Sequence, residues 1–289
     1  MTSQPPLPPS QPEQPAETVP TCYRHPDRET WVRCQRCDRP ICPDCMRDAA
    51  VGFQCPECVA EGNRGIRQAK STFGGALVRA PYVTWTLLGA NVLVFLAQYL
   101  VPDIARLFGM NSIMVALGDE YYRLITAAFV HVSLFHILFN CWALYVIGPY
   151  LERAFGHVRF AALYFVSAFG GSVLGLWMDH PRVFTIGASG AIFGLFGAVF
   201  VVGRRLNLDV RGITVLIVIN LAITFIVPGI SWTGHIGGLV TGAALSAALA
   251  YAPKENRTRW QLMAVAGFVV LLAVLVVVRV PMITFADLG

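Results

Sequence analysis

The chain has 289 residues, of which 55% are hydrophobic and 13% charged, and its formal net charge is +5 at pH 7. A soluble domain carries about 25% charged residues, so this composition excludes an ordinary soluble globular protein. No lysine lies between Lys70 and Lys254, and apolar runs of about 20 residues, the length that crosses a bilayer, recur in that interval. We therefore predict an all-α polytopic membrane protein with a small soluble head.

The first 20 residues are rich in proline, glutamine and serine and contain no apolar stretch. Such a segment buries too little apolar surface to fold, and it lacks the apolar run of a secretory signal peptide. Residues 1–20 are therefore predicted to be a disordered lead.

The next segment, residues 21–60, contains seven of the eight cysteines and one histidine, arranged in four pairs with two residues between the members of each pair. This spacing lets both side chains of a pair bind one metal ion, and eight ligands suffice for two tetrahedral zinc sites. A disulfide framework is the alternative, but no export signal favours it. Apolar residues are too few for a core, so two structural zinc ions would supply the folding energy. The pairs are Cys22 with His25, Cys34 with Cys37, Cys42 with Cys45, and Cys55 with Cys58.

The spacing alone allows either consecutive or interleaved pairs. The pattern resembles the B-box and related cross-brace zinc fingers, in which successive pairs interleave. This resemblance implies one zinc ion on the first and third pairs and another on the second and fourth. We expect a peptide or protein partner for the head rather than nucleic acid. Because its arginines are interleaved with acids, a plain solvated surface is the alternative. The implied sets are Cys22, His25, Cys42 and Cys45, and Cys34, Cys37, Cys55 and Cys58.

A basic linker, residues 61–81, precedes the membrane part. We predict six spans in a core over residues 82–251, and a seventh span with a C-terminal tail over residues 252–289. Segments on one side of these spans carry twelve basic residues and those on the other side four. The positive-inside rule then predicts a multi-pass protein of the cell membrane, with a cytoplasmic head and the C-terminus outside. The predicted spans are 82–101, 127–150, 157–178, 188–203, 213–229, 234–251 and 260–280.

A serine and a histidine begin the fourth and sixth predicted spans. Both spans run from outside to inside, so Ser189 and His235 are expected at similar depth near the outer face. Glycines every four residues give both helices flat faces that allow close approach in lipid. Packing alone is the simpler reading of the glycines, but it does not explain this serine and histidine. The glycines are Gly190 and Gly194 in one span, and Gly234, Gly238 and Gly242 in the other.

The second predicted span adds a polar cluster. His136 and Asn140 are four residues apart, so they share one helix face, and His131 precedes them. Polar side chains in a membrane segment are costly and commonly face a functional site. We therefore predict a functional site inside the membrane formed by the second, fourth and sixth spans.

Together these motifs resemble the rhomboid intramembrane serine proteases over residues 121–251. Two departures are mild: Tyr122 stands where the family often has tryptophan, and Gly234 where it often has alanine. The resemblance implies a six-helix rhomboid-like core plus one C-terminal helix, preceded here by the zinc-binding domain. The motifs are His131-x4-His136-x3-Asn140, Gly187-Ala188-Ser189-Gly190, His235-x2-Gly238-x3-Gly242, Tyr122-Arg123 and Gly148-x3-Glu152-x3-Gly156.

The resemblance also implies a mechanism, without any catalytic cofactor. Ser189 would be the nucleophile and His235 its general base, with no orienting aspartate. His136, Asn140 and the Ser189 backbone N–H would stabilise the oxyanion, and His131 would support the site indirectly. The substrates would be transmembrane segments of other proteins in the bilayer, cut near the outer face.

Three other classes are weighed against a protease. A catalytically inactive rhomboid-like protein would bind membrane clients without cutting them, but both Ser189 and His235 are present. A metal or solute transporter would need more polar lining or an internal repeat. A scaffold acting through its zinc head can coexist with protease activity.

Overall fold

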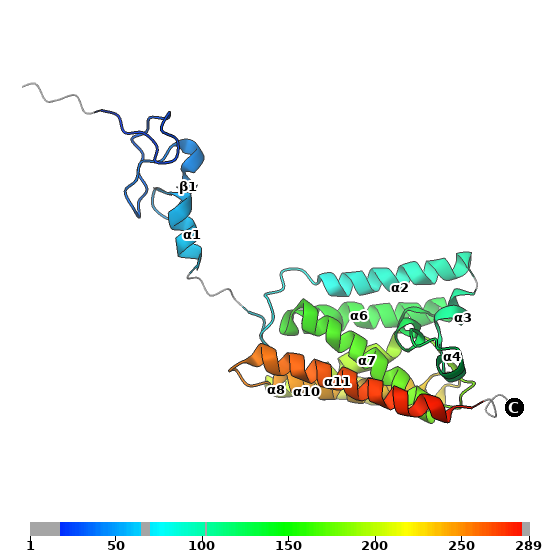
Figure 1. The fold of residues 1–289 in the computed structure, drawn as a ribbon. Coiled ribbons are helices and arrows are strands. Elements are labelled where there is room, and N and C mark those ends of the chain that lie inside the picture. Colours follow the sequence, from blue (N-terminus) through cyan, green and yellow to red (C-terminus); the bar gives the residue numbers. More distant parts are fainter. Residues whose placement is uncertain (1–17, 65–69, 102, 285–289) are drawn as a thin grey trace, which may run out of the picture. The chain divides into compact units, whose positions relative to one another are not determined.

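The computed structural model describes residues 18–64, 70–101 and 103–284. The chain divides into two compact units, Met1–Gln68 and Ala69–Gly289, and Figure 1 draws both. Most of the predicted disordered lead lies outside the described residues, as does part of the linker, residues 65–69.

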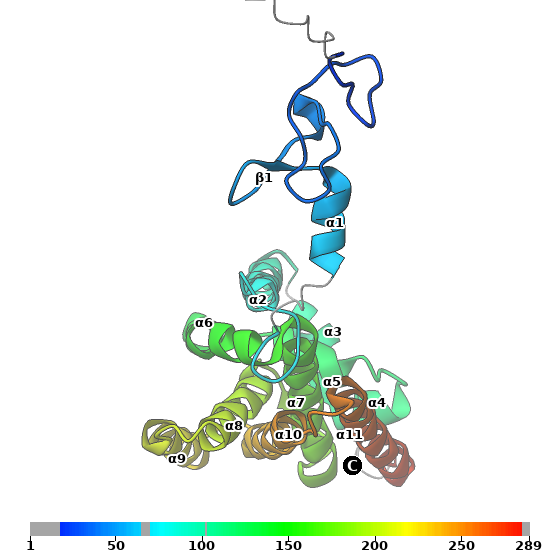
Figure 2. The same cartoon turned by 90° about the vertical axis from the view of Figure 1, so that its left-hand side faces the viewer.

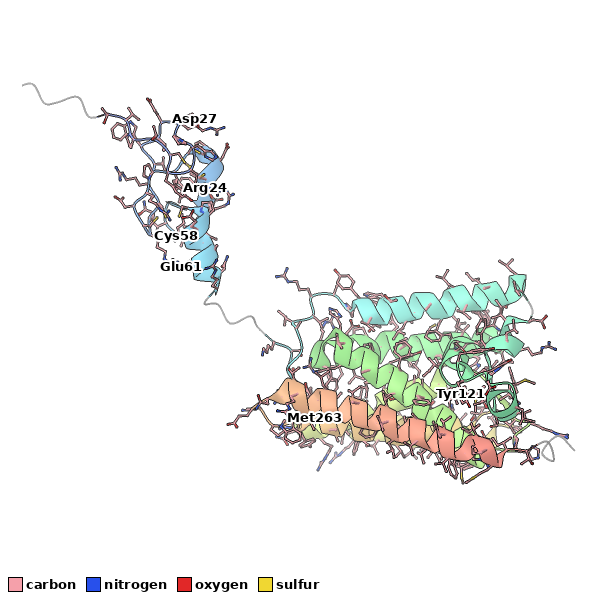
Figure 3. All side chains as sticks on the ribbon, in the orientation of Figure 1. Arg24, Asp27, Cys58, Glu61, Tyr121 and Met263 are labelled. Atoms are coloured by element: carbon pink, nitrogen blue, oxygen red, sulfur yellow. The ribbon has the colours of Figure 1, made fainter. Side chains whose placement is uncertain are left out.

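The first unit contains little regular structure. Its elements are the 3-10 helix η1 (Pro43–Cys45), the strands β1 (Arg47–Asp48) and β2 (Phe53–Gln54), and the helix α1 (Pro56–Arg64). The two strands pair antiparallel. Its buried cluster consists mainly of cysteine side chains around Ile41. Figure 3 draws the side chains of this unit as sticks and labels three of its exposed residues, Arg24, Asp27 and Glu61.

In the second unit, each of the seven predicted spans corresponds to a helix within the described residues. Five of these helices are long and apolar enough to cross a membrane. The other two are α8, with 17 residues, and α9, with 16 residues. The helices are α2 (Tyr82–Leu100), α6 (Leu134–Phe155), α7 (His157–Met178), α8 (Ser189–Arg205), α9 (Arg211–Ile226), α10 (Trp232–Ala250) and α11 (Arg257–Arg279).

Three helices, α7, α8 and α10, form the centre of this unit and pack against one another. The end-on view in Figure 2 shows α9 at the edge of the bundle, next to α8. The seventh helix, α11, packs on α7 and α10. The central helices are therefore the most enclosed. Of the seven helices that correspond to the predicted spans, α9 buries the fewest residues, Thr224 alone.

The second predicted span, 127–150, was placed too early. Residues Ala127–Phe129 form the 3-10 helix η2, and α6 begins only at Leu134. Ser133 is extended and its side chain accepts a hydrogen bond from the His136 backbone N–H, which caps the new helix. His131 consequently lies in the connection before α6 rather than within a helix.

A buried carboxylate joins the ends of α6 and α2. Glu152 has no exposed surface, and its oxygens accept hydrogen bonds from the backbone N–H groups of Val83 and Thr84 and from the Thr84 hydroxyl. These N–H groups are at the start of α2, where a helix has unpaired donors and favours negative charge. His157 contacts the same carboxylate. These hydrogen bonds give Glu152 a structural role, which explains why a carboxylate is buried in this apolar helix bundle.

Helices α8 and α10 meet backbone to backbone, as their glycine spacing predicts. A Cβ atom added to Gly238 would lie 1.9 Å from the carbonyl oxygen of Gly190. One added to Gly242 would lie 2.3 Å from the Cα atom of Gly194. Neither position can hold a side chain unless the two helices separate.

We expect Gly238→Ala to destabilise the folded protein in detergent by about 1–3 kcal/mol, because the added methyl group overpacks a backbone contact. Gly267→Ala in α11 is the matched control, since no atom beyond the local backbone of its own helix lies within 4 Å of a Cβ added there and alanine is the better helix former. Thermal unfolding of both variants beside the parent measures the difference. Equal unfolding temperatures for the two variants would contradict the close α8–α10 contact.

Candidate active site and metal centres

A recess lined mainly by small residues lies around the start of α8. Its volume is about 40 Å³, enough for a few water molecules. Alanine, glycine and serine residues form most of the lining, so the walls are formed largely by backbone. Ser189 is one of the residues that line this recess. The lining residues are Met110, Ala127, Ala128, Ala168, Gly171, Ser172, Gly175, Thr185, Ile186, Gly187, Ser189, Gly190, Ala191, Ser231 and Gly234.

The backbone before Ser189 holds this serine at the first position of α8. Gly187 has φ +121°, a conformation that side chains disfavour, and its N–H donates to the carbonyl of Ala127 at 2.9 Å. A Cβ atom on Gly187 would lie 2.6 Å from Nε2 of His136. The imidazole of His136 therefore lies directly against the loop that leads to Ser189.

A small two-stranded ribbon fixes the same loop from the other side. Strand β4 (Phe184–Thr185) pairs antiparallel with β3 (Met110–Asn111). Residue Met110 lines the recess together with Thr185. The segment before α6 is thereby attached to the loop that carries the serine.

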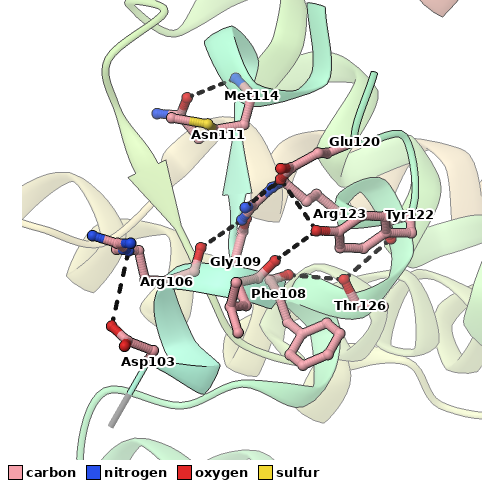
Figure 4. Close-up of polar contacts among 11 residues, drawn as sticks. Asp103, Arg106, Phe108, Gly109, Asn111, Met114, Glu120, Tyr122, Arg123 and Thr126 are labelled. Atoms are coloured by element: carbon pink, nitrogen blue, oxygen red, sulfur yellow. Dashed lines mark hydrogen bonds and ion pairs between the residues drawn. The ribbon is translucent and has the colours of Figure 1, made fainter. Parts of the chain in front are cut away.

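A buried arginine organises that segment, as Figure 4 shows. Arg123 is 3% exposed and forms an ion pair with Glu120. Its guanidinium also donates to the backbone carbonyls of Arg106 and Gly109. Carbonyl acceptors and a carboxylate satisfy the buried charge, so Arg123 holds the helices α3 (Ile104–Phe108) and α5 (Arg123–Thr126) together.

His235 lies in the first turn of α10 and stacks on an aromatic ring of α8. The rings of His235 and Phe193 are 4.0 Å apart at an interplanar angle of 15°. Phe193 follows Ser189 by four residues, so both side chains are on one face of α8. His235 is therefore held over the helix face that begins with the serine.

The side-chain hydrogen bond of His235 is made to α9 and not to Ser189. Its Nδ1 atom is 2.7 Å from the hydroxyl of Thr224 in α9. Among the described residues, no hydrogen bond joins Ser189 to His235. Catalytic hydrogen bonds are often long in the absence of substrate, so the pairing of these two residues stays a prediction.

The polar cluster of α6 is only partly directed toward the serine. Asn140 donates its side-chain N–H to the carbonyl of His136 at 3.0 Å. The ring centroids of His131 and His136 are 5.0 Å apart. His131 is 1% exposed, and its backbone exchanges two hydrogen bonds with the side chain of Gln98 in α2. His136 is thus the member of the cluster that lies against the serine loop, and the ring of His131 is next to that of His136.

Sequence reasoning missed two polar contacts around α10. Thr224 binds His235, and Asp179 accepts a hydrogen bond from the hydroxyl of Thr233 at 2.8 Å. A signal for Thr224 was available, because it follows Asn220 by four residues on the same helix face of an otherwise apolar span. No such pattern identified Asp179, since its partner is 54 residues away.

The first unit brings the eight predicted metal ligands together in two interleaved sets. One set consists of Cys22, His25, Cys42 and Cys45, and the other of Cys34, Cys37, Cys55 and Cys58; within each set the ligand atoms lie within 4.8 Å of one another. All of these cysteines are free thiols. Each set could hold a metal ion, and the arrangement excludes a disulfide framework in this unit.

An arginine hydrogen-bonds to a cysteine of the second metal-ligand set. The Arg39 guanidinium donates to the Cys37 sulfur at 3.2 Å and forms an ion pair with Glu57. This hydrogen bond lowers the pKa of the Cys37 thiol, which favours the thiolate that binds metals. The same guanidinium lies over the ring of Tyr23, 4.4 Å from its centroid.

Comparison with known proteins shows that residues around this site match a known domain family. A family model described as the rhomboid domain matches residues 118–252. The rhomboid protease GluP of Bacillus subtilis (strain 168) is 37% identical over 148 residues, which are 49% of this chain and 29% of GluP. YdcA of the same organism is 36% identical over 48% of this chain and 72% of YdcA. The rhomboid protease AarA of Providencia stuartii is 29% identical over 61% of this chain and 75% of AarA. The chain thus spans less than a third of GluP, and the comparisons with GluP and YdcA cover about half of this chain.

Proposed function

This chain belongs to the rhomboid family, and on that premise we propose that it is an intramembrane serine endopeptidase. Its family and its apolar helices make it a multi-pass membrane protein. The proposed substrates are transmembrane segments of other proteins, cut near the outer face of the membrane. Since a helix hides its peptide carbonyls in hydrogen bonds, a substrate segment must unwind locally, and small or helix-weakening residues are expected near the cut.

One observation supports this proposal most directly. His235 stacks over the face of α8 that begins with Ser189, and Ser189 opens onto a recess. A nucleophile, a base over the same helix face and room for water are parts that acyl transfer requires.

The proposed reaction has two halves. The Ser189 oxygen attacks the peptide carbonyl carbon while its proton passes to Nε2 of His235. The imidazolium then gives this proton to the leaving amine, the carbon–nitrogen bond breaks, and an acyl-enzyme forms. Water repeats the sequence, with His235 as the base, and releases the new carboxyl group and Ser189.

The oxyanion needs hydrogen-bond donors at the place where charge develops. We assign this role to the Ser189 backbone N–H, His136 and Asn140. The contact of His136 with the serine loop supports its part. Asn140 has a partner within α6, so its amide would have to turn toward the substrate when one binds. His131 would then orient His136 from behind.

Zinc is the metal we propose for the two cysteine sets, two ions per chain with a structural role. Ligands on one tetrahedral zinc ion lie about 3.5–3.8 Å from one another, given the usual zinc–ligand bond lengths. The Cys37 and Cys55 sulfurs are 3.8 Å apart, and the His25 Nδ1 atom is 3.8 Å from the Cys22 sulfur and slightly closer, at 3.3 Å, to the Cys42 sulfur. Thiolates and imidazole are the donors that structural zinc sites use.

The head and the membrane orientation complete the proposal. The excess of basic residues on one side of the spans favours a cytoplasmic head and an outer C-terminus in the cell membrane. A peptide or protein is the proposed partner of the head.

The second candidate function, a catalytically inactive protein that binds membrane clients, is favoured by one fact: Ser189 and His235 share no hydrogen bond among the described contacts.

Activity of the parent protein distinguishes these candidates. Purified, zinc-loaded protein in detergent is mixed with single-span substrates, and with a fluorophosphonate that labels activated serines. We expect cleavage within the substrate span, near its outer end, and labelling that is located to Ser189 by mass spectrometry. A folded protein that neither cuts several substrates nor takes up the label would overturn the proposed protease and support the client-binding alternative.

A further inference from the structure

Helix α9 buries a single residue, and that residue touches the proposed catalytic base. Thr224 is 4% exposed, whereas every other residue of Arg211–Ile226 is partly or fully accessible. Its hydroxyl oxygen is 2.7 Å from Nδ1 of His235. This contact therefore joins the least enclosed helix of the bundle to the active site.

The hydroxyl of Thr224 makes a second hydrogen bond, which determines the direction of the first. Its oxygen is 2.8 Å from the carbonyl oxygen of Asn220. A carbonyl can only accept, and a hydroxyl has one hydrogen to donate. Because that hydrogen is directed to Asn220, the hydroxyl accepts at its other contact, and the hydrogen there must belong to Nδ1 of His235.

We infer that Thr224 fixes His235 in the tautomer that carries hydrogen on Nδ1 and leaves Nε2 free. This inference rests on the proposed function, because a free Nε2 atom is what the base needs to take the proton of Ser189. The hydrogen bond made by one ring nitrogen decides which nitrogen is protonated. Thr224 is therefore a positioning residue that acts through His235.

The ring stack cannot supply this effect. Phe193 holds the plane of the imidazole, but an aromatic face does not distinguish the two nitrogens. In serine proteases with a triad, a buried aspartate accepts from the Nδ1–H of the histidine and sets its tautomer. Here a neutral hydroxyl occupies the accepting position, and its own hydrogen bond to the helix backbone prevents it from donating to the ring.

Threonine 224 can be tested against a matched threonine of the same helix. Thr224→Val keeps the shape of the side chain and removes the hydroxyl, and Thr224→Ser restores a hydroxyl. Thr214→Val is the control, because Thr214 makes the same kind of backbone hydrogen bond, to Val210 at 2.8 Å, on an exposed part of α9. We expect Thr224→Val to lower kcat by roughly tenfold to a hundredfold with little change in KM, the size of one hydrogen bond that orients a base. Thr224→Ser should recover most of the rate, and Thr214→Val should match the parent.

Nitrogen-15 NMR of histidine-labelled full-length protein reads the tautomer without any substrate. The His235 signals are assigned by their loss in His235→Gln. We expect the Nδ1–H form in the parent and in Thr214→Val, and a shift toward the Nε2–H form in Thr224→Val.

The two measurements separate the inference from the proposed function. An active parent protein with its His235 in the Nε2–H form, or a Thr224→Val variant with an unchanged tautomer and rate, would overturn the inference alone. Equal loss of rate in Thr224→Val and Thr214→Val would also overturn it, since a general effect on α9 would then suffice. An inert parent protein would overturn the proposed function and with it any catalytic role for Thr224, whatever tautomer the NMR signals report.

Discussion

Replacement of Ser189 by alanine is expected to abolish measurable cleavage of a single-span substrate. Removal of the nucleophile of a serine protease lowers kcat by a factor on the order of 10⁶. His235→Ala should lower the rate by a similar factor, because an unactivated serine hydroxyl is a weak nucleophile. The double variant should be no slower than either single variant, since the two residues act as a unit.

A second serine of the same recess provides the control. Ser172 lines it from α7, and Ser172→Ala changes the wall without touching the proposed chemistry. We expect its rate to remain within a few-fold of the parent. Rates are measured on proteins whose unfolding temperatures agree, so that loss of fold is not mistaken for loss of chemistry. Cleavage by Ser189→Ala at the parent rate would contradict the assignment of the nucleophile.

The sequence identified the parts of this site that depend on local spacing. Four successive Cys/His pairs with two residues between their members predict metal ligation, and the four-residue glycine spacing predicts a flat helix face. Both patterns hold in the structure, in the two ligand sets and in the contact of Gly238 with Gly190. Each of these features is encoded within one turn of chain or one helix.

Features that depend on the meeting of distant segments were beyond sequence reasoning. The start of α6 was predicted too early because apolar residues continue through Ala127–Phe129, while the cap formed by Ser133 ends that run. Thr224 was overlooked because a threonine in a membrane helix ordinarily bonds its own backbone, as Thr224 also does here. Only the packing of α9 beside α10 reveals its second contact.

Removal of metal is expected to unfold the head and leave the membrane unit intact. The buried cluster of the head is formed mainly by the ligand cysteines themselves around Ile41, so little hydrophobic burial remains without the ions. Structural zinc sites contribute about 10–16 kcal/mol of apparent binding free energy at pH 7, more than the few kcal/mol that so small a core can supply. Each of the two units is compact and has its own internal contacts. Unfolding of the head therefore need not unfold the membrane unit.

Zinc stoichiometry and limited proteolysis of the full-length protein test this expectation. The parent should release two zinc ions per chain to a strong chelator, after which residues 21–64 become sensitive to protease while the helical signal of the membrane unit is unchanged. Cys22→Ser and Cys34→Ser remove one ligand from each of the two sets, and each should retain no more than one tightly bound ion. Cys141→Ser is the matched control, since Cys141 is the cysteine outside both sets, and it should retain two zinc ions.

Because the proposed chemistry uses no metal, the chelated protein should still cut a substrate that the membrane unit recognises alone. A head that resists protease after chelation would show that its fold does not depend on the ions, and a parent without bound zinc would contradict the proposed metal.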